Sequence, residues 1–297
     1  MTKQWLLIAL LTILMGPAGA AQTRSLHILL TNDDGYDSLG VKAVADVLQA
    51  AGHRLTIVAP LGQRSGSGMK ITLGELAVVE QAPGVWSVDA SPADAVSIAL
   101  NHIMKEERPD LIVSGANFGQ NLGANVMISG TVGAAMMGVL EGIPAIAVSV
   151  GLNLSEAKAE PHHFPSTIAA FPAAARLTLA AVNALAARTG DALLPAGHML
   201  NINYPASAPG SVVKTRWAPV SRFGGFRLIY PSSSGASLRS WIEVDARAEN
   251  DGESDTALFA AGHATISVLK PDWNGAAEVT TGLRDNLAVA IEQLTSE

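Results

Sequence analysis

Short apolar runs alternate with amphipathic stretches between about residues 25 and 150. Polar residues bound each run, which is typical of strands that are buried in a parallel sheet. The runs are Leu26–Leu30, Arg54–Ala59, Leu111–Ser114 and Ala145–Val150. This alternation predicts an α/β fold in which a mostly parallel, Rossmann-like sheet forms the middle of three layers and helices cover both of its faces.

The stretches between these runs have helical spacing and the residues that favour helix ends. Val44 and Leu48 lie four positions apart, and Gly52 fits the position just after a helix. Ser91 begins the run Ser-Pro-Ala-Asp, which combines an N-cap, a proline in the first turn and an acid at the third position. Ser129 is a further candidate N-cap. The expected elements are helices over 39–51, 91–104 and 130–141 and a β-ribbon over 71–80 and 85–90.

The composition changes after about Gly151, where Gly, Ser and Pro clusters begin to separate the apolar runs. The expected elements are an Ala-rich helix over 166–188, strands over 199–204, 241–244 and 263–269, and a closing helix over 282–294. We therefore expect one domain over residues 21–297. An α/β core covers about 25–205, and a β-rich extension with the C-terminal helix covers about 206–297.

The N-terminus has the pattern of a secretory signal peptide. Lys3 supplies the positive charge, Trp5–Met15 is apolar, and Ala18-Gly19-Ala20 fits a small-x-small cleavage site. We expect cleavage after Ala20 and export to the periplasm or the medium, with no stable membrane association afterwards. The alternative is an uncleaved membrane anchor, which the shortness of the apolar run disfavours.

The composition and net charge exclude several classes of protein function. Hydrophobic residues make up 48% of the 297 residues and charged residues 15%, which excludes a disordered chain. Without cysteine there are no disulfides, thiolate metal sites or cysteine nucleophile. A formal net charge of −7 argues against general nucleic-acid binding. The sequence also lacks a P-loop and a G-x-S-x-G nucleophile elbow.

Candidate chemistry begins directly after the first apolar run, at Asn32-Asp33-Asp34-Gly35. Ligands of open α/β sheets bind at the carboxyl ends of the strands. In a tight turn the two carboxylates converge, and their repulsion favours a cation between them. Carboxylate oxygens suit Mg²⁺, Mn²⁺ or Ca²⁺. The alternative is an ordinary Asx turn that caps the next helix.

Two Gly-rich loops follow neighbouring strands. Arg64-Ser65-Gly66-Ser67-Gly68 could ligate a metal or hold an anion through hydroxyl and N–H groups, or it could be a flexible linker. The loop from Ser114 to Gly123 contains Asn117 and Asn121, and it continues to the helix start at Ser129. Such a helix N-terminus can bind an anion, although Ser129 could also be only an N-cap. An acidic pair beside an anion site indicates a bridging cation.

Together these loops resemble the SurE (survival protein E) family of metal-dependent 5′/3′-nucleotidases, which are also described as acid phosphatases. The resemblance spans nearly the whole chain after the signal segment and keeps the family's order. The matching motifs are ILLTNDDG (28–35), IVAP (57–60), RSGSG (64–68), SPADAV (91–96), PDLIVSGANFGQNLG (109–123), SGTVGAAM (129–136), IPAIAVS (143–149), LNINYP (200–205) and SDTALFAAGHATISVL (254–269).

The resemblance also assigns roles to individual residues. It implies that the divalent metal is ligated by Asp33, Asp34, Ser65 and Asn117. It implies that the phosphate is surrounded by Asn32, Asn121, Ser129, Gly130 and Thr131. Two departures stand out: Asp37-Ser38-Leu39-Gly40 replaces the family's frequent Ala-Pro-Gly, and residues 211–250 show little of the family pattern.

The predicted function is hydrolysis of nucleoside 5′- or 3′-monophosphates. One divalent cation per subunit, Mn²⁺ or Mg²⁺, would activate a water for in-line attack, and Asp33, Asp34 and Asn117 would be the catalytic residues. The competing hypothesis is an exported solute-binding protein that holds a phosphorylated ligand through a metal without turnover. The resemblance further implies a homodimer or homotetramer.

Overall fold

A computed structural model of the chain describes residues 24–157, 164–188, 190, 192–207, 211–230, 237–238, 240–272 and 274–295. The predicted signal segment, residues 1–20, lies outside the described residues, so its cleavage and the export of the chain remain predictions.

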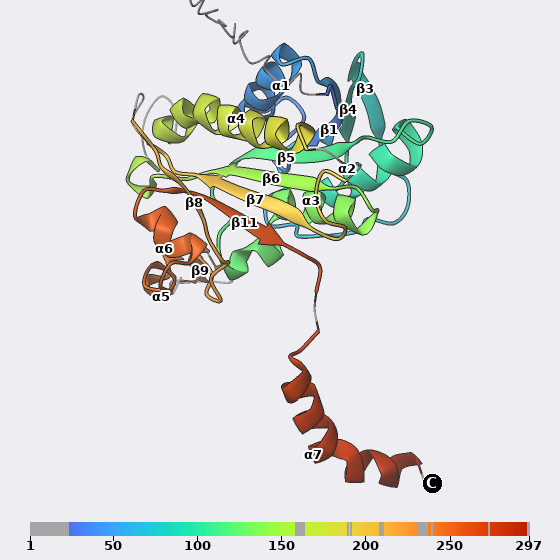
Figure 1. Ribbon diagram of the computed structural model, residues 1–297, viewed down its shortest axis with the longest axis vertical. Coiled ribbons are helices and arrows are strands. Elements are labelled where there is room, and N and C mark those ends of the chain that lie inside the picture. The colour runs from blue at the N-terminus through green and yellow to red at the C-terminus, as the bar shows by residue number, and fades with distance from the viewer. Residues whose placement is uncertain are drawn as a thin grey trace, which may run out of the picture.

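The described residues form a nine-stranded sheet in the order β3-β4-β2-β1-β5-β6-β7-β11-β8 (Figure 1). Six neighbouring strands, from β4 to β7, are parallel, whereas β3 and β11 run antiparallel to their neighbours β4 and β7. The strands are β1 (His27–Thr31), β2 (Arg54–Pro60), β3 (Val78–Ala82), β4 (Val85–Val88), β5 (Leu111–Phe118), β6 (Ala145–Val150), β7 (Met199–Tyr204), β8 (Thr215–Trp217) and β11 (Ala264–Leu269).

Helices cover both faces of this sheet, as the alternation predicts (Figure 1). The helices α1 and α4 pack on one face, where Leu30, Val44 and Phe171 belong to one apolar core. The helices α2 and α3 pack on the other face, where Leu29 and Ile112 belong to a second core. The helices are α1 (Leu39–Ala50), α2 (Pro92–Ile98), α3 (Gly130–Leu140), α4 (Pro165–Ala186), α5 (Ala246–Glu249), α6 (Asp255–Ala260) and α7 (Ala277–Thr295).

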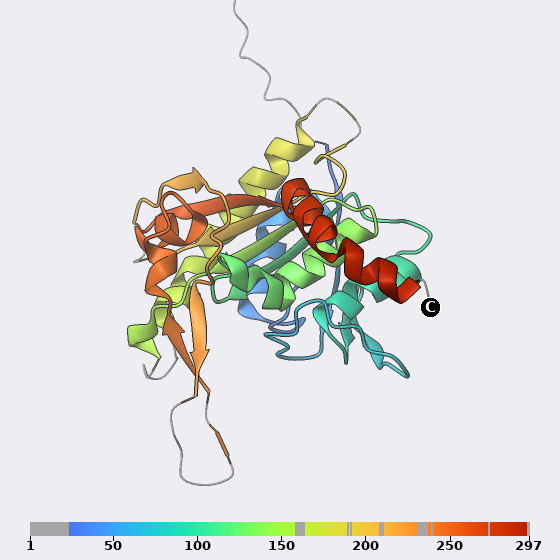
Figure 2. The same cartoon turned by 90° about the horizontal axis from the view of Figure 1, so that it is seen from below.

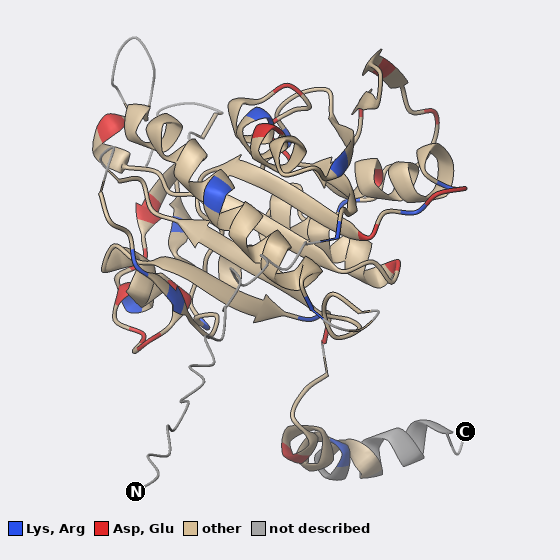
Figure 3. Cartoon of the chain, turned by 45° about the horizontal axis from the view of Figure 1, so that its top comes forward, with Lys and Arg blue, Asp and Glu red and all other residues tan. Residues whose placement is uncertain are grey.

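The helix α4 is long and apolar enough to cross a membrane by length and composition alone. Its buried residues, Ala170, Phe171 and Ala174 among them, are part of the core under α1. We therefore interpret α4 as a core helix of the α/β fold. Charged residues lie mainly on the outer loops and at the helix ends, and the central sheet is almost free of them (Figure 3).

Several expected elements differ in extent from those observed. The strand β5 continues to Phe118, because after an irregularity in the register its pairing with β6 resumes at Asn117 and Ser149. The helix α2 continues as a π-helix over Ala99–Ile103. The C-terminal helix begins at Ala277 and projects away from the sheet (Figure 1).

The expected β-rich extension is divided between two places. Its strands β8 and β11 join the edge of the main sheet. A separate antiparallel hairpin is formed by β9 (Phe226–Ile229) and β10 (Trp241–Val244), and it extends from the body (Figure 2). The short helices α5 and α6 lie between this hairpin and β11 in the sequence.

Candidate active site

Five of the nine predicted site residues meet in one cavity at the carboxyl ends of β1, β2 and β5. Because Thr31 pairs with Ser114, the loops that follow β1 and β5 begin side by side. A cavity of about 180 Å³ lies there. Among its lining residues are Asp33, Ser65, Asn117, Asn121 and Ser129. Three loops that are far apart in the sequence therefore contribute to one cavity.

Asp33 is the most deeply buried acid of this group, with 2% of its surface exposed. The Thr131 hydroxyl donates to its Oδ1 at 2.6 Å. Burial and the nearby Asp34 carboxylate raise the pKa of Asp33 from its ordinary value of 3.8 to about 6. A carboxylate in this state gains from a cation, which would compensate both the lost hydration and the repulsion.

Asp34 lies beside the cavity and lines a neighbouring one with Gln63 and Phe118. Gln63 Nε2 donates to its Oδ1 and the Phe118 backbone N–H donates to its Oδ2, each at 2.8 Å. Burial nevertheless raises the pKa of Asp34. Gln63 Oε1 also accepts from the Ser65 backbone N–H, so one side chain ties the acidic turn to the Ser65 loop. Sequence reasoning did not find Gln63.

Asn117 has a buried oxygen without a partner. Its Nδ2 donates to the Gly119 carbonyl at 2.6 Å, whereas no hydrogen bond to its Oδ1 is found among the described residues. A buried acceptor without a partner costs about 1–3 kcal/mol, and a bound cation would satisfy it. The side chain is therefore oriented with its oxygen free to act as a ligand.

The Ser67 hydroxyl oxygen is another buried oxygen of this region without a hydrogen-bond partner within the described part of the chain. A Cβ added at Gly130 would lie 2.8 Å from both Ser67 Oγ and Asp33 Oδ2. Glycine at the start of α3 thus keeps open a small space between two oxygens. The sequence pattern marks Ser67 only as one residue of a Gly-rich loop, and its free hydroxyl makes that loop a better candidate for an ion or phosphate site.

These donors fit a hard divalent cation such as Mg²⁺ or Mn²⁺. Nowhere among the described residues do three or more His, Asp or Glu side chains form a group that could hold a metal ion, so a metal here would need neutral ligands as well as the two carboxylates. Amide and hydroxyl oxygens of Asn117 and Ser65 are of that kind. We conclude that the residues present fit the expected metal.

Asn121 is held by a polar network that reaches into β7. Its backbone N–H donates to Asn203 Oδ1 at 2.8 Å, and its carbonyl accepts from Asn201 Nδ2 at 2.9 Å. Its side-chain amide donates to Ser149 Oγ at 2.9 Å and lies 3.4 Å from Thr131 Oγ1. The sequence signal for Asn201 and Asn203 is their alternate spacing in an otherwise apolar strand, whereas the pattern alone predicts only a strand over 199–204.

The helix start at Ser129 is confirmed as a cap. Ser129 Oγ accepts from the Val132 backbone N–H at 3.1 Å, and Ser129 also lines the cavity. The first turn of an α-helix has N–H groups without helical partners and carries partial positive charge, which favours an anion at this end of the cavity. Thr131 is fully buried, and its hydroxyl donates to Asp33 Oδ1.

The side chain of Asn32 makes hydrogen bonds within the turn that it belongs to. Its Nδ2 donates to Ser38 Oγ at 2.8 Å, and its Oδ1 accepts from the Gly35 backbone N–H at 3.2 Å. Ser38 in turn caps α1. The described contacts of Asn32 are therefore structural, and its expected contact with phosphate stays a prediction.

Comparison with known proteins places this chain and its fold in a family. The model of the family described as survival protein SurE matches residues 28–224, about two thirds of the chain. The chain belongs to this family. The SurE crystal structure from Aquifex aeolicus has the same α/β fold, with a TM-score of 0.69 at 26% identity, covering 87% of this chain and 98% of that one.

Similar relatives carry the name 5′-nucleotidase SurE. The one from Prochlorococcus marinus (strain MIT 9303) is 35% identical over 272 residues, which cover 84% of this chain and 93% of that relative. The one from Microcystis aeruginosa is 46% identical over a shorter stretch of 134 residues, which covers 43% of this chain and 49% of that relative.

Asp255 is a buried acid of this SurE-family chain that sequence reasoning did not single out. Its Oδ2 accepts from the Gly123 N–H at 2.9 Å, and its Oδ1 accepts from Ser221 N–H at 2.9 Å and from Thr256 N–H at 2.8 Å. Burial raises its pKa. Asp255 thereby fixes the end of the loop that carries Asn121. Ser254, the N-cap that precedes it, was the available sequence signal.

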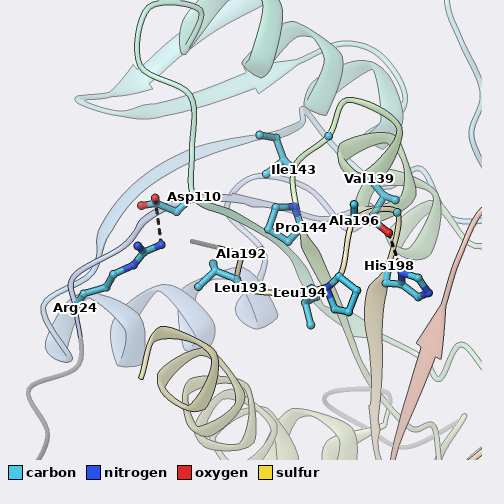
Figure 4. A pocket seen from close by; sticks show the side chains of 13 residues that line it. Arg24, Asp110, Val139, Ile143, Pro144, Ala192, Leu193, Leu194, Ala196 and His198 are labelled. Atoms are coloured by element: carbon cyan, nitrogen blue, oxygen red, sulfur yellow. Dashed lines mark hydrogen bonds and ion pairs between the residues drawn. The ribbon is translucent and has the colours of Figure 1, made fainter. Parts of the chain in front are cut away.

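A second cavity of this SurE-family chain, of about 260 Å³, lies at the opposite edge of the sheet, before the strands β5, β6 and β7 (Figure 4). Its polar side chains are already paired. Arg24 lies 3.7 Å from Asp110, whose other oxygen accepts from the His27 backbone N–H, and His198 Nδ1 lies 2.9 Å from the Ala196 carbonyl. None of the predicted site residues lines it.

Proposed function

We propose that this chain is a divalent-metal-dependent phosphomonoesterase that hydrolyses nucleoside 5′- or 3′-monophosphates to nucleoside and phosphate. The observation that supports this most is the partnerless Asn117 oxygen in the same cavity as Asp33 and the start of α3. A cation ligand and an anion site in one cavity suit a phosphate ester. The relatives named above are 5′-nucleotidases, which favours the same class of substrate.

Asp33, Asp34, Ser65 and Asn117 would hold the cation. When bound there, the cation neutralises charge on the phosphoryl group and lowers the pKa of a water. The first turn of α3, from Ser129 to Thr131, and the amide of Asn121 would bind the phosphoryl oxygens. Their positions are fixed before substrate arrives, by the Ser129 cap and by the contacts to Asn201 and Asn203.

The buried carboxylates provide a base for the attacking water. Thr131 occupies Asp33 Oδ1, which leaves Oδ2 facing the space next to Gly130. In this proposal water attacks phosphorus in line, its proton passes to Asp33 or Asp34, the P–O bond to the nucleoside breaks, and the leaving oxygen takes up a proton from that acid or from solvent.

The test is hydrolysis by the protein without residues 1–20. We expect phosphate release from 5′-AMP, 3′-AMP and p-nitrophenyl phosphate with Mn²⁺ or Mg²⁺, and loss of release after EDTA. Restoration by added metal is the control for damage by the chelator. AMP binding without any phosphate release would support the solute-binding alternative and contradict the proposed enzyme.

We also propose export and self-association. The basic, apolar and small-residue pattern of residues 1–20 supports export with cleavage after Ala20. The projecting helix α7 exposes Val279, Leu283 and Leu287 at four-residue intervals, which supports a homodimer or homotetramer. Mass spectrometry of the exported protein and its sedimentation velocity test the two proposals separately.

A further inference from the structure

The cavity has a second, apolar wall, which the β9–β10 hairpin supplies. Phe226 pairs with Val244 across the hairpin, and Leu228 pairs with Ile242. Because side chains alternate along a strand, these four apolar residues share one face of the hairpin. Phe226, Ile242 and Val244 line the cavity that contains Asp33. The other face carries the Arg227–Glu243 ion pair, with Arg227 Nε 2.6 Å from Glu243.

This wall is attached to the phosphate end of the cavity. Asn125 Oδ1 accepts from the Phe226 backbone N–H at 3.0 Å, and Gly123 forms a β-bridge with Gly224. A Cβ at Gly123 would overlap the Phe223 carbonyl oxygen, and its φ of +54° also favours glycine, so the approach requires glycine there. The loop that carries Asn121 therefore holds the hairpin at a fixed place relative to the proposed phosphate site.

The wall is apolar, and its side chains remain partly exposed to solvent. Ile242 is 41% exposed and Val244 43% exposed, although both line the cavity. Leu152 and Leu154, which follow β6, line the same cavity. Among the described lining residues Asp33 alone carries a charge, and it belongs to the polar side. The cavity thus has one polar side and one apolar side, which matches a ligand with a phosphate and an apolar ring.

We propose that this apolar wall is the subsite for the base of a nucleoside monophosphate, and that Ile242, Val244 and Phe226 are its specificity-determining residues. This inference rests on the proposed function, and it adds the position of the base within the cavity. The wall recognises the base through contact area, without a charged group for the base edges. It therefore accepts purines and pyrimidines, and it contributes more to the larger purines.

The test compares AMP with ribose 5-phosphate, which lacks the base. We expect Ile242→Ser to raise KM for AMP about fivefold with little change in kcat, because the apolar contact is made equally in the ground state and the transition state. The kinetics of ribose 5-phosphate should stay unchanged. UMP should be affected less than AMP. The matched control is Ile229→Ser, since Ile229 pairs with Trp241 on the other face and does not line the cavity.

Equal losses on AMP and ribose 5-phosphate, no loss on AMP, or the same change in both isoleucine variants would overturn the inference. Circular dichroism checks folding, and Val244→Ala is the milder second variant. If the wild-type protein hydrolyses neither compound, the proposed function fails, and the subsite is then judged by calorimetric binding with Mn²⁺ present. An AMP Kd weakened about fivefold by Ile242→Ser, with no change for ribose 5-phosphate, would still support it. An unchanged AMP Kd would refute it.

Discussion

The two edges of the central sheet carry cavities of opposite character. At the amino ends of β5, β6 and β7, a cavity of about 260 Å³ has its polar groups paired, with Arg24 beside Asp110. At the carboxyl ends, the smaller cavity of about 180 Å³ is lined by a buried acid with a raised pKa and by Asn117, whose oxygen has no partner among the described residues. Cavity size alone would place the ligand site at the amino ends of the strands. The raised pKa of Asp33 and the unpaired Asn117 oxygen place it at the carboxyl ends.

This difference indicates that a ligand binds at the carboxyl ends of the strands. A folded chain gains nothing from leaving buried oxygens without partners or carboxylates against each other, because both cost free energy. Asp33, Asn117 and Ser67 carry these costs close together, although other buried side-chain oxygens of the described residues, such as those of Asn201 and Thr265, also lack partners. A cation and a phosphate would remove them. The amino-end cavity carries no comparable cost.

The largest expected effect comes from exchanging one acid at each edge. Asp33→Asn should lower kcat/KM for AMP by about 10³-fold or more, because it removes a cation ligand and the candidate base. Asp110→Asn at the other edge should leave the activity unchanged. Steady-state assays of both variants with saturating Mn²⁺ make the comparison. Similar losses in the two variants would remove the distinction between the edges.

Filling the space at the start of α3 should be nearly as damaging. A methyl group at Gly130 would lie 2.8 Å from Asp33 Oδ2 and Ser67 Oγ, so Gly130→Ala should lower kcat about 10²-fold. Gly282→Ala is the control, since no atom lies within 4 Å of a Cβ there. Both variants should give the same far-ultraviolet circular dichroism. Full activity of Gly130→Ala would show that this space is not used.

The raised pKa of Asp33 predicts a pH-dependent cost in the metal-free protein. An acid whose pKa rises from 3.8 to about 6 on folding binds its proton more tightly in the folded state. Stability is then fully present below pH 4 and is lost as the pH rises through 6, by about 3 kcal/mol. Asp33→Asn lacks this loss, so the variant should become the more stable protein at pH 7.

Urea unfolding in EDTA at pH 4, 5, 6 and 7 checks this sign. The free energy of unfolding of the wild type should fall relative to that of Asp33→Asn across this range. A difference that does not change with pH would mean that Asp33 is not strained by burial and by Asp34. Asp110→Asn serves again as the control from the opposite edge.

The smallest expected effect concerns Ser67. Its hydroxyl adds one neutral oxygen next to Asp33, so Ser67→Ala should lower kcat/KM for AMP about fivefold, the value of one neutral hydrogen bond or ligand contact. The stability should not fall, since the hydroxyl has no hydrogen bond to lose among the described residues. A loss of stability without a change in kcat/KM would make Ser67 a structural residue.

Local pattern predicted most of the fold. The apolar runs correspond to β1, β2, β5 and β6, because a strand that is buried on both faces must be apolar throughout. The end of β5 was missed, since Gly115 and Asn117 are poor strand residues and only the pairing with β6 places them in the sheet. The C-terminal helix was predicted five residues short for a similar reason: Gly282 suggested its start, whereas it lies inside α7.

The site could be predicted only in part. Asp33, Asn117 and Ser129 follow predicted strands or precede a predicted helix, so topology alone brings them to one edge. Gln63, Ser149 and Asp255 act through hydrogen bonds to residues far away in the sequence, and no local pattern indicates such partners. The apolar wall of the hairpin was missed because segment 211–250 showed little of the family pattern.

Calorimetric titration of the EDTA-treated protein with Mn²⁺ tests the central claim most directly. If the Asp33 carboxylate after β1 and the partnerless Asn117 oxygen in β5 are cation ligands, the wild type should bind one Mn²⁺ per chain. The variant that combines Asp33→Asn with Asn117→Ala should then bind at least about 10²-fold more weakly. Equal Mn²⁺ affinity of the two proteins would contradict the account.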